Sequence, residues 1–363
     1  MWHIGCAKLG VVNCMKKFRS IILLFPLVLL SACNTIGYYS QAISGHFELL
    51  SQRQPVDKLI NDPETPEPLR RQLQQSQAML RFAFDELKLP DNGSYTRYVA
   101  LQRPYPVWNV LATPELSLQP KTWCAPVVGC VAYRNYYSQQ AAKHFARSLR
   151  QKGFDVYVGA VTAYSTLGWF RDPLLSSMLR GAEADLAGVL FHELAHQRVF
   201  AASDTAFSES FATTVEIEGV RRWLDKQDPK LFADYQLRKQ RSDQFLAMAL
   251  KYKSRLESLY ASDKPDAEKR TQKQRVFTEL KQEYAGLKKQ WQGYEGYDHW
   301  IENGLNNAKL ASVGNYHTLV PALQNLLKES GNDLGEFYRR AERLARMNKA
   351  ARQKELQRLN QSP

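Results

Sequence analysis

Hydrophobic and polar positions change their period along the chain, and each change predicts a change of secondary structure. From Gln41 to Leu89 apolar residues recur at helical spacing, with breaks at Pro55 and in residues 61–68, because prolines favour helix ends. A helix is also expected at residues 138–152. Short runs of alternating, β-rich residues lie at 95–101, 107–111, 127–133 and 156–161. These runs predict a small mixed sheet with helices around it.

The pattern beyond Asp225 is strongly helical and polar. Apolar residues recur at helical spacing in 232–260 and 268–291, and a turn-rich stretch between them predicts a long helical hairpin. A last helix is expected from about residue 333 to residue 359. The predicted fold class is therefore α+β and mostly helical. Three parts are predicted: a signal segment at 1–32, a core with N-terminal helices at 33–225, and a helical domain completing the cleft at 226–363.

The first 32 residues have the three regions of a secretory signal. A basic start at 15–19 precedes an apolar run at 21–30 that is too short to span a bilayer comfortably, and small residues follow. Leu30-Ser31-Ala32-Cys33 resembles the bacterial lipobox. The resemblance implies cleavage before Cys33 and a lipid anchor on that cysteine, with Asn34 directing the protein to the outer membrane, facing the periplasm. An uncleaved anchor is the alternative.

The composition is that of a globular protein, with 44% hydrophobic and 23% charged residues among 363. The formal net charge is +13, of which the signal segment carries four basic groups and no acidic one, leaving +9 for the remainder. Acidic residues are interleaved with the basic ones, which favours a solvated surface; anionic lipid or cell-wall polymers are the alternative partners. No nucleic-acid-binding signature is present, so a nucleic-acid partner is not expected.

Two of the five cysteines remain once the signal segment and Cys33 are set aside. Cys124 and Cys130 would enter an oxidising compartment, where such a pair favours a disulfide. Free thiols or a metal pair are the alternatives.

The segment from Phe191 to Arg198 holds the candidate chemistry. In a helix, His192 and His196 stand at i and i+4, so one turn presents both imidazoles to the same point in space. Glu193 is rotated by about 100° from His192, which suits a general base acting on a water rather than a metal ligand. A catalytic zinc keeps three protein ligands and one open position, so a third donor must come from elsewhere.

Glu209 is the best candidate for that third ligand. Turn and N-cap residues at 203–205 let the chain reverse and begin a second helix, and Glu209 lies in its first turns. Thr213 and Glu216 follow on the same face. Glu216 is the alternative ligand, although a supporting hydrogen bond to a ligand is the favoured role.

These motifs resemble the gluzincin metallopeptidases, in which a glutamate on the next helix completes a His-Glu-x-x-His site. Together with the lipobox, the two cysteines and Asn306-Asn307-Ala308, they resemble the "putative aminopeptidase" family of secreted bacterial lipoproteins. The resemblance implies a zincin-like core, one zinc ion per chain and peptide hydrolysis. Thr213 stands where thermolysin-like members have an aspartate that supports a histidine ligand.

The sequence therefore predicts a zinc metallopeptidase that trims peptides from the amino end by metal-activated water. Tyr316 or His317 is expected to stabilise the oxyanion, with Tyr164 as a weaker candidate. Asp172 or Glu216 is a candidate for holding the substrate ammonium group. The competing interpretation is a lipid-anchored envelope scaffold or binding protein with a non-catalytic metal site.

Overall fold

A computed structural model describes residues 41, 44–45, 47–125, 129–163, 171–201, 204–225, 227, 229–313 and 319–361. Contacts divide the chain into two units, residues 1–51 and residues 52–363. In the first unit, residues 47–51 are helical. The predicted signal segment and the predicted lipid-bearing Cys33 lie outside the described residues. The predicted boundary after residue 225 stays a prediction.

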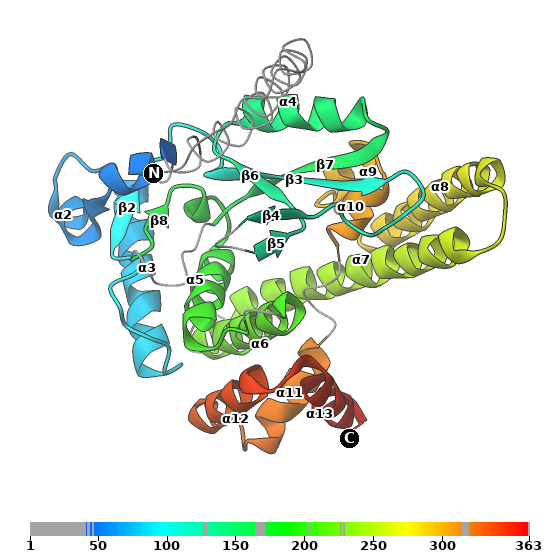
Figure 1. Ribbon diagram of the computed structural model, residues 1–363. Coiled ribbons are helices and arrows are strands. Elements are labelled where there is room, and N and C mark those ends of the chain that lie inside the picture. Colours follow the sequence, from blue (N-terminus) through cyan, green and yellow to red (C-terminus); the bar gives the residue numbers. More distant parts are fainter. Residues whose placement is uncertain are drawn as a thin grey trace, which may run out of the picture. The chain divides into compact units, whose positions relative to one another are not determined.

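Helices predominate in the second unit, as the α+β prediction requires (Figure 1). The helices are α2 (Val56–Asn61), α3 (Glu67–Asp85), α4 (Gln139–Arg150), α5 (Glu183–Arg198), α6 (Thr205–Leu224), α7 (Pro229–Ala261), α8 (Asp266–Gln290), α9 (Asp298–Glu302), α10 (Asn307–Ala311), α11 (Val320–Glu329), α12 (Leu334–Arg346) and α13 (Lys349–Gln361), with a 3-10 turn η1 (Met178–Arg180). Each helix in the described residues is too short or too polar to cross a membrane.

The strands form three small sheets rather than one mixed sheet. They are β1 (Gln54–Pro55), β2 (Arg97–Val99), β3 (Val107–Pro114), β4 (Trp123–Ala125), β5 (Gly129–Val131), β6 (Arg134–Tyr136), β7 (Phe154–Val161) and β8 (Leu174–Leu175). The orders are β1-β2-β8, β6-β3-β7 and β4-β5, and only β2 and β8 pair in parallel. The run predicted as one strand at 127–133 ends early because the chain turns after Val131, so β5 pairs with β4 while β6 pairs with β3.

The sheet β6-β3-β7 is covered on both faces. Alternation along β3 sends Val110 and Ala112 to the face on which α4 packs, whereas Leu111 contacts Tyr157 and α10 on the other face. Helix α4 begins at Ser138, whose hydroxyl accepts a hydrogen bond from the Ala141 amide at 3.3 Å. Its buried residues are small or apolar, which permits a close approach to the strands: Ala142, Ala146 and Leu149.

Asn307, in the Asn306-Asn307-Ala308 motif, is fully buried and joins three elements. Its side-chain oxygen accepts a hydrogen bond from the hydroxyl of Tyr260 on α7 at 2.8 Å. Its amide group donates to three carbonyl oxygens at the end of β3 and in the loop that follows, those of Pro114, Glu115 and Ser117 (3.3, 2.8 and 3.1 Å). The motif that contributed to the family resemblance therefore has a structural explanation in this chain.

Replacing Asn307 with leucine, which has a similar volume, should lower the free energy of unfolding by about 3 kcal/mol, because it leaves buried carbonyl oxygens without donors. Urea unfolding followed by circular dichroism measures the loss. The same change at exposed Asn303 serves as a control and should have little effect. A loss below about 1 kcal/mol at Asn307 would contradict this account.

The single C-terminal helix predicted at 333–359 is wrong: the chain forms α12 and α13 with a break between them. Met347 is extended (φ −68°, ψ 154°), and the side chain of Asn348 accepts a hydrogen bond from the Ala351 amide at 2.9 Å. An asparagine that caps a new helix competes with continuing the old one. The helical pattern is unbroken across the junction, so the sequence did not reveal the turn.

Helices α5 and α6 cross side by side (Figure 1). Within the turn and N-cap residues expected at 203–205, Asp204 is the N-cap of α6, and its carboxylate accepts a hydrogen bond from the Phe207 amide at 3.2 Å. Gly219 on α6 permits the close approach, because a Cβ atom there would lie 2.7 Å from the ring of Phe191 on α5 and 2.8 Å from Leu87. The position of α6 against α5 is thus determined by glycine and by the packed aromatic ring.

Candidate metal centre

Two imidazoles project from the C-terminal half of α5. His192 and His196 lie one helical turn apart, and their Nε2 atoms are 3.2 Å from each other. His196 is buried, with 7% of its surface exposed, and His192 is half-buried. The expected i and i+4 arrangement is therefore present, and both rings turn the same nitrogen toward one point.

Glu209 of α6 brings a third donor atom to that point. Its Oε2 lies 3.4 Å from Nε2 of His192 and 3.6 Å from Nε2 of His196. Zinc with nitrogen and oxygen ligands at about 2.0–2.1 Å in a tetrahedron separates those ligands by about 3.3 Å. The three sides of the observed triangle, 3.2, 3.4 and 3.6 Å, match that spacing. These three residues could therefore hold a metal ion.

Glu216 lies behind the donor triangle, two turns farther along α6. Its Oε2 is 3.0 Å from Nδ1 of His192, so it fixes the ring and leaves Nε2 directed at the candidate ion site. Such a partner orients a ligating histidine and makes it a better donor. Thr213 is buried on the same helix, and no contact described for it joins it to either histidine.

The electrostatics of the cluster reflect two carboxylates beside two imidazoles. Burial lowers the pKa of His192, but Glu209 and Glu216 outweigh it and raise that pKa to about 10. Burial raises the pKa of Glu209, whereas the two histidines lower it to about 2. The carboxylate of Glu209 is thus ionised at neutral pH, which is the form that binds a cation. In the same cluster, the buried Nδ1 of His196 has no hydrogen-bond partner among the described residues.

Gly188 leaves room for Glu216 to reach His192. A Cβ atom at this position of α5 would lie 3.3 Å from Oε1 of Glu216, closer than most such contacts. The side chain of Glu216 would have to move by a few tenths of an ångström, and its hydrogen bond to His192 would lengthen. The sequence offered no signal for this role, because it depends on how the two helices cross.

Gly188→Ala is expected to weaken zinc binding about tenfold, the lower end of the effect of disturbing a ligand's hydrogen-bond partner. Competition with a chromogenic chelator measures the affinity. Gly286→Ala is the matched control: it lies on α8 with nothing near the added Cβ and should leave affinity unchanged. Equal zinc affinity in both variants would exclude Gly188 from supporting the site.

The other predicted site residues differ in burial, and some lie outside the described ranges. Glu193 is half-buried and follows His192 directly on α5. Asp172 is 1% exposed, which leaves it little surface for a substrate ammonium group. Tyr164, Tyr316 and His317 lie outside the described residues. The predicted cysteine pair is joined: Cys124 and Cys130 form a disulfide with an S–S distance of 1.99 Å, which links β4 to β5.

The site belongs to a class in which one helix supplies two histidines, and a second helix supplies a carboxylate, to one metal-binding point. A family model described as "Putative aminopeptidase" matches residues 37–356, and the chain belongs to this family. No curated protein and no solved structure matches the chain. The family name gives a peptidase as the activity class and a peptide as the substrate class.

Proposed function

We propose that the protein is a zinc-dependent aminopeptidase with a gluzincin-type site on a zincin-like core. The observation that carries the proposal is the triangle of donor atoms from His192, His196 and Glu209, whose sides match the ligand spacing of a tetrahedral zinc site; among the described residues these three form the metal-binding group. Nitrogen and carboxylate donors suit zinc among the common metals. The family match supports the peptidase assignment.

A zinc ion held at this point supplies a Lewis acid for the scissile carbonyl and lowers the pKa of water toward neutrality. Glu193 is the general base of the proposal: its carboxylate accepts a proton from the attacking water and returns it to the leaving amine. Because Glu193 follows His192 on α5, the base is fixed to the same helix as two of the ligands. Glu216 keeps the His192 ring in its orientation throughout.

Two parts of the proposal concern residues outside the described ranges. Tyr316 or His317 would donate a hydrogen bond to the oxyanion, which such a donor typically stabilises by about 3 kcal/mol. Cys33 would carry a lipid that anchors the enzyme to the outer membrane, so that the site works on peptides in the periplasm. Both parts rest on the sequence motifs.

The test compares aminoacyl arylamides with the same substrates acetylated at the amino group. The zinc-loaded protein should hydrolyse the free amino substrates, lose activity with a strong chelator and regain it when zinc is added. Hydrolysis of only the acetylated substrates would defeat the exopeptidase assignment. Activity that survives complete metal removal, shown by elemental analysis, would defeat the metallopeptidase assignment.

A further inference from the structure

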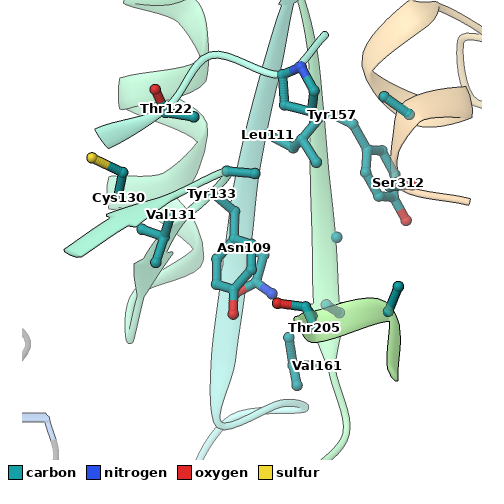
Figure 2. A pocket seen from close by; sticks show the side chains of 16 residues that line it. Asn109, Leu111, Thr122, Cys130, Val131, Tyr133, Tyr157, Val161, Thr205 and Ser312 are labelled. Atoms are coloured by element: carbon teal, nitrogen blue, oxygen red, sulfur yellow. The ribbon is translucent and has the colours of Figure 1, made fainter. Parts of the chain in front are cut away.

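A cavity of about 530 Å³ lies between the sheet β6-β3-β7, the hairpin β4-β5 and the first turn of α6. Its volume is within the range of small-molecule sites, about 300–1,000 Å³. Figure 2 shows its walls, which come from separate elements: Asn109 and Leu111 of β3, Tyr157 and Val161 of β7, Val131 of β5 and Thr205 of α6.

Part of the cavity wall lies one helical turn before Glu209 on α6. Thr205 and Ala206 line the cavity, and Glu209 follows them on α6 at i+4 and i+3, on the same face of the helix. Side chains of a helix tilt toward its N-terminus, so the Glu209 carboxylate leans toward the turn that forms the cavity wall. A group bound at the candidate metal site would therefore have this cavity beside it.

The described side chains that line the cavity are uncharged. None of the 16 described lining residues has a side chain that is charged at neutral pH. An ammonium or carboxylate group placed there would lose its water without gaining a counter-ion, whereas an apolar group gains from burial. The walls therefore favour a large uncharged side chain.

Asn109 and Gly159 give the cavity floor its shape and polarity. They are partners in the β3-β7 register, and both line the cavity. A Cβ atom at Gly159 would lie 2.9 Å from the ring of Tyr157, so this position has no room for a larger residue. The Oδ1 of Asn109 is buried and has no hydrogen-bond partner among the described residues, so a ligand donor that reached it would satisfy an unpaired acceptor.

We infer that this cavity is the specificity subsite for the substrate residue next to the scissile bond. It takes a large uncharged side chain, and Asn109 favours one that carries a donor, tyrosine or tryptophan. The inference rests on the proposed function, since it places the scissile bond at the donor triangle. Lysine and glutamate side chains are excluded by the absence of a counter-charge in the described walls.

The test measures binding rather than turnover. Hydroxamates of tyrosine, tryptophan, phenylalanine, lysine and glutamate are titrated into the zinc-loaded full chain by calorimetry. Tyrosine and tryptophan derivatives should bind tightest, and the lysine and glutamate derivatives at least about tenfold more weakly. Ala132→Phe, which fills the cavity from one wall, should abolish this difference. Asn109→Leu should remove the advantage of tyrosine over phenylalanine.

Ala267→Phe, an exposed change on α8 outside the cavity walls, is the matched control and should preserve the order of affinities. Zinc content and the thermal midpoint show whether each variant is folded. Equal affinity for charged and uncharged derivatives, or an unchanged order after the cavity is filled, overturns the subsite. An unchanged ratio of tyrosine to phenylalanine in Asn109→Leu removes Asn109 from it.

A second probe separates the subsite from the metal chemistry. Binding of N-acetyl-tyrosinamide to the His196→Ala variant, observed by ligand NMR, does not depend on zinc. If the His196→Ala variant binds this probe and the double variant His196→Ala, Ala132→Phe does not, the subsite is supported. This result holds even if the protein hydrolyses no peptide. If hydrolysis occurs but neither probe discriminates among side chains, the proposed function stands and the subsite is wrong.

Discussion

Glu193→Gln should lower kcat by about 1,000-fold and leave one zinc ion per chain. The amide keeps the size of the carboxylate but cannot accept the water proton, and a general base contributes about 100- to 10,000-fold to such reactions. The donor triangle of His192, His196 and Glu209 does not include Glu193, so the ion should stay bound. Steady-state kinetics on an aminoacyl arylamide and elemental analysis of the same preparation give the two numbers.

His196→Ala is the contrasting variant. It removes one of the three donor atoms, so zinc content and turnover should both fall. Full activity of Glu193→Gln with normal zinc content would contradict its role as base. Normal zinc content in His196→Ala would show that the ion binds elsewhere in the protein. The pair therefore separates the loss of a proton acceptor from the loss of the metal.

Arg352→Met should destabilise the fold by about 3–5 kcal/mol, because it leaves Asp204 as a buried charge without a counter-ion. Arg352 of α13 is 1% exposed and Asp204 is 6% exposed, and their charged atoms lie 2.9 Å apart. Asp204 also caps α6, the helix that carries Glu209. The C-terminal helix thus holds the start of the ligand-bearing helix, and zinc binding should weaken with stability.

Urea unfolding of the metal-free protein measures the first effect, and chelator competition the second. Arg358→Met is the control: Arg358 lies on the same helix but at the surface, and the loss of its ion pairs with Glu329 and Glu355 should change stability little. Adding Asp204→Asn to Arg352→Met should recover part of the lost stability, since the unpaired charge is gone. A stability of Arg352→Met equal to that of Arg358→Met would disprove the anchoring role.

Several elements were predictable because their causes are local. The i and i+4 spacing of His192 and His196 follows from helical geometry alone, and the turn and N-cap residues at 203–205 indicated where α6 starts. The helical hairpin was predicted from apolar residues that recur at helical spacing over two long segments, and α7 and α8 confirm it. In contrast, α11 was not predicted, and the break between α12 and α13 was missed because the helical pattern continues through it.

Other features depend on contacts between distant segments. The separation of Asp204 and Arg352 in the chain gives no hint that they form a buried ion pair, and a lone arginine in a polar helix reads as a solvated residue. Asn307 was noticed only as part of a family resemblance, whereas its hydrogen bonds to the end of β3 and to α7 explain its presence. Long-range pairing leaves no periodic signal.

The sequence by itself determined that one helix presents two imidazoles side by side, because a spacing of four residues is one turn of any α-helix. Only the tertiary structure decided that Glu209 meets them and that Glu216 holds His192. It also decided that a cavity lies one turn away from Glu209 and that its described lining residues carry no charge. These arrangements depend on how closely α5 and α6 approach each other, which packing at Gly188 and Gly219 determines. No local sequence pattern indicates that approach.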